Sequence, residues 1–181
     1  LESSCKAIWK LKVIPKFQHF IWRILNNMIT TNALLSRWRR SLTSPCLICD
    51  EFVESIEHLF FYCPWTKCVW FGSPLGVLSS ALGVLNFKYW WLQITDKSVC
   101  SSRDISLICW TLWFIWKERN RCAFNQVLPN PYVVINFALN SNTEFWISLE
   151  IPLPDSNPSG LLASKETHWF TPITGYLKVN C

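Results

Sequence analysis

Apolar residues recur along the chain with the period of α-helices, and the first clear case begins at Pro15. Proline suits the first turn of a helix, where its missing backbone N–H is not needed. After it, one apolar stripe runs at intervals of three and four residues, through Phe17, Phe20, Ile21, Ile24, Leu25 and Met28. Thr30 or Thr31 can cap a second short helix and so complete an αα-hairpin. That helix carries Leu34, Leu35 and Trp38.

Further helical patterns extend to about residue 150. Pro64 opens a helix that should bury Trp70 together with either Trp65 or Val69. Residues 71–87 hold three of the five glycines and predict irregular structure. Helices are then expected over about residues 87–94, 104–120 and 132–149.

The amino-acid composition of the chain changes after residue 150. Three prolines and a glycine follow one another closely, at Pro152, Pro154, Pro158 and Gly160. They indicate a linker over residues 151–168. The final segment, TGYLKVNC, alternates polar and apolar residues. This is the pattern of a β-strand that is cut off after its first few residues.

Composition adds an expectation of exposed apolar surface. Half of the 181 residues are hydrophobic, twelve are tryptophan and 16% are charged, against about 25% charged in a typical soluble domain. Such a chain is expected to expose apolar surface when isolated, as a piece of a larger protein does. A first residue of Leu1 rather than Met agrees with a fragment.

Cysteine usage and hydropathy predict a reducing, intracellular location, either nuclear or cytoplasmic. Nine cysteines is an odd number, and their spacing does not suggest the disulfide framework of a small secreted domain. The most apolar run, Ile105–Trp116, has 12 residues and charged flanks. A bilayer span needs about 20 residues, so this run predicts a buried helix and no membrane partner.

The net charge of +5 is unevenly distributed. Residues 1–45 carry eight basic side chains and one acidic side chain, whereas the remainder has a small acidic excess. A basic first quarter permits contact with the phosphate backbone of RNA or DNA. The candidate contact residues are Lys16, Arg23, Arg37, Arg39 and Arg40. A solvated helix face would account for the same charges equally well.

Three cysteines and a histidine have the spacing C-x2-C-x8-H-x4-C, formed by Cys46, Cys49, His58 and Cys63. A C-x2-C turn lets two thiolates face a common point, as tetrahedral Zn²⁺ requires. On a continuous α-helix, His58 and Cys63 would point about 140° apart. Both can reach one ion if Cys63 lies just past the helix end.

The flanking residues agree with that arrangement. Ser55 can cap a helix in which His58 sits in the first turn, and Pro64 disfavours helical geometry at Cys63. Three thiolates and a neutral imidazole leave no open position for water, so we predict one structural zinc ion and no small-molecule substrate. The fold class expected is mainly α: a small zinc-stapled helical domain followed by helices, a Pro-rich linker and a truncated β-strand.

The same cysteines could serve in three different ways without forming this zinc site. They could be free buried thiols, Cys46 and Cys49 could form a disulfide, or Cys68 could replace one of the four ligands. His19 and His168 stand alone and are interpreted as ordinary polar residues.

Two stretches, WKLKVIPKFQHFIWRILNNMITTNALL and CLICDEFVESIEHLFFYCPWTKCVW, resemble a known family. It is the zinc-binding domain that follows the polymerase in plant LINE-type (non-LTR) retrotransposon reverse transcriptases. The family pattern includes F-x-W-R, C-x-x-C and E-[TS]-x-E-H-L-F-x-x-C-P. The matching residues are Trp9, Lys10, Pro15, Lys16, Phe20, Trp22, Arg23, Cys46, Cys49, Glu54, Ser55, Glu57, His58, Leu59, Phe60, Cys63, Pro64 and Trp70.

The resemblance continues more loosely towards the C-terminus. ICWTLWFIWKERNRCAFN is similar to a W-x-I-W-x-x-R-N helix of the same polyproteins, with matches at Trp113, Trp116, Arg119, Asn120 and Phe124. HWFTPITGYLKVNC resembles the start of their RNase H domain, with matches at Trp169, Pro172, Gly175, Lys178 and Asn180. The resemblance implies a zinc-binding domain over residues 5–70, a helical connector over 71–150, the linker over 151–168 and a truncated RNase H-like start over 169–181.

The resemblance implies a zinc-binding accessory module of a reverse transcriptase, as a fragment or degenerate copy. Its partners would be RNA or DNA and a reverse transcriptase domain. RNase H hydrolysis needs several carboxylates around Mg²⁺, and the chain stops at Cys181, where the family goes on through that fold. We therefore expect no catalysis. The alternatives are a protein-interaction module that docks on a polymerase, or the remnant of an RNase H enzyme.

Overall fold

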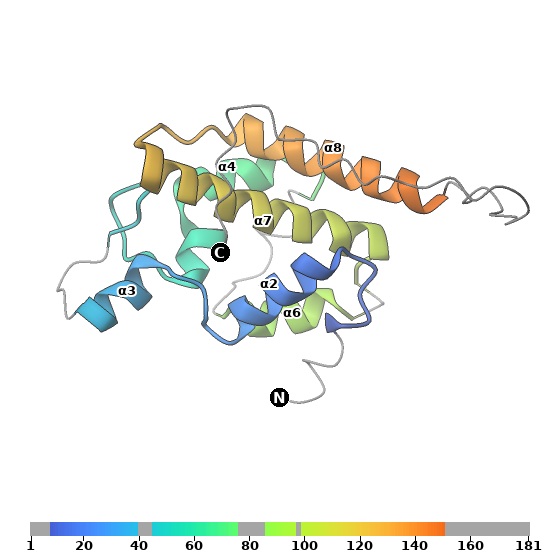
Figure 1. The fold of residues 1–181 in the computed structure, drawn as a ribbon, viewed down its shortest axis with the longest axis horizontal. Helices are drawn as coiled ribbons and strands as arrows, with labels where there is room; N and C mark the ends of the chain where they lie inside the picture. The colour runs from blue at the N-terminus through green and yellow to red at the C-terminus, as the bar shows by residue number, and fades with distance from the viewer. Residues whose placement is uncertain (1–7, 40–44, 76–85, 97–98, 151–181) are drawn as a thin grey trace, which may run out of the picture. The chain divides into compact units, whose positions relative to one another are not determined.

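The computed structural model describes residues 8–39, 45–75, 86–96 and 99–150, and these residues are mainly helical (Figure 1). In chain order the helices are α2 (Pro15–Leu25), α3 (Asn32–Arg39), the π-helical turn η1 (His58–Tyr62), α4 (Pro64–Gly72), α6 (Phe87–Ile94), α7 (Ser102–Asn125) and α8 (Pro131–Glu150). Within the described ranges, the only β feature is an isolated antiparallel bridge between Pro45 and Val53. The mainly α fold is confirmed. The predicted linker, the terminal strand and most of the glycine-rich segment lie outside the described residues.

Both helices of the predicted N-terminal αα-hairpin form, and the first ends earlier than expected, but the main helix contacts of α2 are with α7 and α6 rather than with α3. α2 buries Phe17, Phe20, Ile21 and Ile24, which belong to the predicted apolar stripe. The apolar pattern places Met28 in the same stripe, but Met28 lies beyond the helix and is 50% exposed. The reason is local, because Asn27 has a φ of 55°, a left-handed conformation that ends the helix.

Local capping sets the starts of two further helices. The Thr31 hydroxyl accepts a hydrogen bond from the backbone N–H of Leu34 at 3.4 Å, so Thr31 caps α3 as predicted. At α7, Ser101 and Asp104 form a reciprocal capping box, which starts the helix slightly before the expected residue 104.

The longest helix, α7, lies at the centre of the described residues. It packs against α8 on one side and against α2 on the other (Figure 1). Its contact with α2 is aromatic: the ring centroids of Phe17 and Trp110 are 4.6 Å apart, and those of Phe20 and Trp113 are 5.1 Å apart. Many of the tryptophans are therefore core residues. Among the described helices, none has both the length and the apolar character to cross a membrane.

The core also runs through α4 and α6. In α4, Val69 and Trp70 are buried, whereas Trp65 is only partly buried, so Val69 is the inward residue of the two alternatives. Phe61 of the π-helical turn packs against Trp90 of α6, with ring centroids 4.7 Å apart. Residues on both sides of position 70 thus share one hydrophobic core.

Candidate metal centre

The side chains of Cys46, Cys49, His58 and Cys63 converge on one point. One ligand atom from each lies within 4.8 Å of the other three. The Cys49 Sγ and the His58 Nε2 are 3.3 Å apart. Zinc bonds of about 2.3 Å to sulfur and 2.0 Å to nitrogen place neighbouring ligand atoms of a tetrahedron about 3.5 Å apart. The four residues therefore fit one zinc ion.

A short hairpin presents the first pair of ligands. Its ends are joined by the Pro45–Val53 bridge, and the backbone N–H of Cys46 donates to the carbonyl of Phe52 at 2.7 Å. Inside it, the N–H of Asp50 donates to the carbonyl of Cys46 at 2.8 Å, which closes the turn over Cys49. Asp50 has a φ of 57°, a left-handed conformation that aspartate tolerates.

A π-helical turn presents the second pair. The Ser55 hydroxyl accepts a hydrogen bond from the N–H of His58 at 3.0 Å, as the predicted cap requires. The N–H of Cys63 donates to the carbonyl of His58 at 2.8 Å, five residues back. This turn holds one residue more than an α-helical turn, so it brings His58 and Cys63 towards one face. Cys63 then leaves helical geometry, with a ψ of 128°, and lies just past the helix end as expected.

Side chains of α4 stabilise this irregular turn through hydrogen bonds. The π-helical turn leaves carbonyls that an α-helix would have paired. The Thr66 hydroxyl donates to the carbonyl of Leu59, and the Trp70 indole N–H donates to the carbonyl of Phe60, both at 2.7 Å. Both donors are buried, so the turn is held by the side chains of the next helix. The sequence pattern did not predict a π-helical turn.

The protonation states of the site suit metal binding. Burial, and then the positive charge of Lys67, lower the pKa of His58, so its imidazole is neutral near pH 7. A hydrogen bond between the Cys46 and Cys63 side chains raises the pKa of Cys46 and lowers that of Cys63. Zinc would displace the thiol protons on binding both sulfurs as thiolates.

The donor set indicates a structural role for the ion. Four protein ligands fill a tetrahedron and leave no position for water or substrate, so the ion would hold the fold rather than perform hydrolysis. Cys46 and Cys49 are free thiols, not a disulfide. Cys68 is exposed on α4 and is not part of the converging group.

Residues 2–70 match the family model described as zinc-binding in reverse transcriptase. This segment is a reverse transcriptase zinc-binding domain. Its limits nearly coincide with those of the segment that carries the sequence resemblance, and its converging ligands lie within them. The family is a zinc-binding one, and the match assigns no catalytic activity to the segment.

One similar protein comes from a plant, Arabidopsis thaliana, and is named "Putative ribonuclease H protein". It is 22% identical over 193 residues, which cover 99% of this chain and 29% of the relative. The chain therefore spans less than a third of the length of the curated relative it matches. No solved structure matches the chain.

Two of the predicted phosphate-contact residues, Lys16 and Arg23, lie on α2. Lys16 is exposed on α2, and its Nζ lies 5.2–5.4 Å from the ring centroids of Phe17, Trp110 and Trp113. Partial burial of the Lys16 side chain, and then the positive charge of Lys117, lower the pKa of Lys16. Arg23, also on α2, donates to the carbonyl of Met28 at 3.1 Å.

The remaining three predicted residues belong to α3 or follow it. Arg37 is exposed on α3. Arg39 is the last residue of that helix, and only its backbone is described. Arg40 lies outside the described residues.

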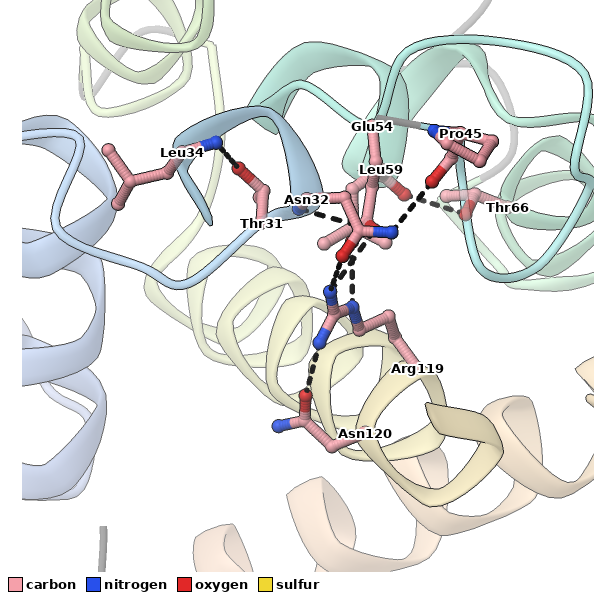
Figure 2. A network of polar contacts seen from close by, with 9 residues as sticks. All are labelled: Thr31, Asn32, Leu34, Pro45, Glu54, Leu59, Thr66, Arg119 and Asn120. Atoms are coloured by element: carbon pink, nitrogen blue, oxygen red, sulfur yellow. Dashed lines mark hydrogen bonds and ion pairs between the residues drawn. The ribbon is translucent and has the colours of Figure 1, made fainter. Parts of the chain in front are cut away.

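A buried ion pair beside the hairpin was not predicted. Arg119 of α7 contacts Glu54, which lies between the hairpin and the π-helical turn (Figure 2). Each residue belongs to a motif that carries the family resemblance, E-S-x-E-H for Glu54 and W-x-x-R-N for Arg119. That shared feature was the available signal, but it does not show that the two residues meet.

Proposed function

We propose that the chain is a non-catalytic, nucleic-acid-binding accessory module of a retrotransposon-derived reverse transcriptase. The observation that carries the proposal is the charge of the described segment 8–39, which contains α2 and α3 and precedes the zinc ligands. Described residues 8–39 carry six basic side chains and no acidic one. Such a segment attracts phosphate groups.

Four basic side chains of this segment are available for an external anion. Lys10, Lys12, Lys16 and Arg37 are exposed. Among the described residues, the arginines in ion pairs are Arg103, Arg119 and Arg121, which all belong to α7. Lys10, Lys12, Lys16 and Arg37 therefore do not have to leave a protein carboxylate in order to bind a phosphate.

The zinc site would act on this segment by fixing its shape. The N–H of Ala33 donates to the carbonyl of Glu54 at 3.3 Å, and the side-chain amide of Asn32 donates to the carbonyl of Pro45 at 2.8 Å. The first turn of α3 is thereby attached to both ends of the zinc hairpin. We propose that the ion holds α3 in place and performs no chemistry. We propose a reducing, intracellular compartment, where cysteine thiols stay free to bind the ion.

The test is the salt dependence of binding to a labelled single-stranded RNA and a labelled DNA duplex, measured by fluorescence anisotropy. The logarithm of the binding constant should fall linearly with the logarithm of the salt concentration. Replacing one phosphate-binding residue, as in Arg37→Gln or Lys12→Gln, should reduce that slope by about 0.7 for the single strand and about 0.9 for the duplex.

The matched control is Lys88→Gln, which removes one positive charge from α6, outside the N-terminal helices. Its slope should equal that of the unchanged chain. Equal loss of slope in all three variants would show only a response to net charge and would contradict the assignment of phosphate binding to residues 8–39. Mg²⁺-dependent cleavage of an RNA–DNA hybrid by the purified chain would contradict the non-catalytic role.

A second candidate is a protein-interaction module that docks on a polymerase domain. It is favoured by apolar side chains on α4 and α8, where Phe71 is 86% exposed and Tyr132 is 73% exposed. These two residues line a hollow of about 840 Å³ together with Ile135 and Leu139. Association with a polymerase fragment that persists at high salt would support this function over the first.

A further inference from the structure

We propose that Arg119 is a positioning residue of the zinc site and acts on it through Glu54. Arg119 belongs to α7, far beyond residue 70, where the zinc-binding family match ends. Glu54 lies between the hairpin that bears Cys46 and Cys49 and the turn that bears His58 and Cys63. The pair therefore sits at the junction between the two halves of the site (Figure 2).

The ion pair between Arg119 and Glu54 is bidentate and buried. The Arg119 Nε donates to one carboxylate oxygen of Glu54 at 2.7 Å, and its Nη2 donates to the other at 3.1 Å. The side chains are 5% and 0% exposed, respectively. This fork geometry fixes both the distance and the orientation of the carboxylate, which a lysine could not do.

The remaining donors of Arg119 extend the contact to neighbouring residues. Its Nη2 also donates to the side-chain oxygen of Asn32 at 3.3 Å, and its Nη1 donates to that of Asn120 at 3.1 Å. The guanidinium carbon lies 5.3 Å from the ring centroid of Trp116. Arg119 is thus held by residues of its own helix, and it holds Asn32 of α3 and Glu54 of the segment between the hairpin and the π-helical turn.

This hydrogen-bond network contacts both ends of the zinc hairpin. At one end, Asn32 donates to the carbonyl of Pro45, the residue before Cys46, at 2.8 Å. At the other end, Glu54 follows Val53, the bridge partner of Pro45. Because Asn32 and Glu54 both receive hydrogen bonds from Arg119, one guanidinium sets the spacing of the two hairpin ends.

Glu54 also directly precedes the segment that carries the second pair of ligands. Ser55, the next residue, caps the turn through the N–H of His58. A shift of Glu54 would therefore move the cap that orients His58 as well as the hairpin that orients Cys46. Partners that orient ligand residues in this way commonly contribute about 10–100-fold to metal affinity.

The experiment measures Zn²⁺ affinity of the full chain by competition with a chromophoric chelator, together with the absorption spectrum of the Co²⁺-substituted protein. Arg119→Met removes the fork, Arg119→Lys keeps the charge, and Glu54→Gln keeps the shape of the acceptor. We expect the Met and Gln variants to bind Zn²⁺ about tenfold or more weakly, with altered Co²⁺ d–d bands. Arg119→Lys should recover part of the loss.

The matched control is Arg121→Gln. It breaks the ion pair between the exposed Arg121 and the buried Glu118, which both belong to α7 and not to the hairpin. Arg121→Gln therefore measures how much Zn²⁺ affinity is lost through lower stability alone. The control should lose less Zn²⁺ affinity than Arg119→Met and should keep the Co²⁺ spectrum of the unchanged chain. If Arg119→Met does not fold, Arg119→Lys and Glu54→Gln decide the question.

Zn²⁺ affinity and Co²⁺ spectra equal to those of Arg121→Gln in the folded Arg119 and Glu54 variants would overturn the proposal. The assay contains no nucleic acid. A negative result for Arg119 would therefore not contradict the proposed nucleic-acid binding. Likewise, a failure of nucleic-acid binding would not contradict the role of Arg119.

Discussion

Two glutamates, Glu54 and Glu118, are buried, and each contacts an arginine of α7. A buried carboxylate is tolerated when it is paired and hydrogen-bonded. Removing one partner of a buried pair costs about 3–5 kcal/mol, because the other charge is left uncompensated. At the residue scale, the stability of this chain therefore depends on a few polar pairs as well as on its many aromatic residues.

Glu118 makes part of that stability depend on pH. Burial acts to raise its pKa, but hydrogen bonds from Arg121 and from the N–H of Asn130 outweigh burial, and the pKa lies below its ordinary value of 4.5. Because the folded state holds the proton less tightly, this pair stabilises the fold above about pH 4.5 and the stabilisation is lost as the pH falls further.

Glu118→Gln should consequently lower the free energy of unfolding in urea near pH 7. The difference from the unchanged chain should shrink as the pH falls below about 4.5. Glu144→Gln, at an exposed position on α8, is the control and should show a small difference at every pH. A Glu118→Gln effect that did not vary with pH would contradict this assignment.

At the scale of elements, the zinc site joins two structures that are unstable alone. The hairpin has an isolated bridge in place of a regular ladder, and the second element is a π-helical turn held by Thr66 and Trp70. Neither element buries enough surface to form alone. In zinc-finger peptides, a structural site contributes about 10–16 kcal/mol of apparent binding free energy, which can determine whether such a segment folds.

The corresponding prediction uses two cysteines on either side of Pro64. Cys63→Ser removes a converging ligand, whereas Cys68→Ser changes an exposed thiol outside the group. Native mass spectrometry should find one Zn²⁺ per chain in the unchanged protein and in Cys68→Ser, and none retained in Cys63→Ser. Amide hydrogen exchange over residues 45–63 should be faster in Cys63→Ser.

The opposite pattern, with zinc lost only in Cys68→Ser, would place Cys68 in the ligand set. A chelator that removes zinc without raising amide exchange over residues 45–63 would contradict the folding role of the ion.

At the scale of the whole molecule, the zinc-binding domain is not separate from the helices that follow it. Phe17 and Phe20 of α2 pack on Trp110 and Trp113 of α7, and Glu54 is neutralised by Arg119 of the same helix. A chain that ended near residue 70 would expose those rings and leave the carboxylate without its partner. The unit that folds is therefore expected to extend through α8.

Two truncations test this expectation. A chain of residues 1–75 with zinc should unfold without a cooperative transition, because the apolar partners of α2 are missing. A chain of residues 1–151, which retains the compact unit formed by Leu1–Ile151, should unfold cooperatively like the full chain. Tryptophan fluorescence and far-ultraviolet circular dichroism during denaturant titration measure both. Cooperative unfolding of the shorter chain would contradict the shared core.

Predictions from the sequence succeeded where the physical cause is local. The stripe of α2, the Thr31 and Ser55 caps, Pro64 at the start of α4 and the spacing of the four ligands each depend on residues within a few positions of one another. The end of α2 was missed, because the left-handed conformation of Asn27 is a single backbone choice that the apolar pattern does not encode.

The sequence by itself thus determined the helical periods, the four candidate zinc residues and the excess of positive charge near the N-terminus. Only the tertiary structure decided how His58 and Cys63 reach one point, because the π-helical turn depends on hydrogen bonds from α4. It also decided that Arg119 meets Glu54, 65 positions away along the chain. Such a contact exists only once α7 packs against the rest of the core, and no short-range pattern specifies that packing.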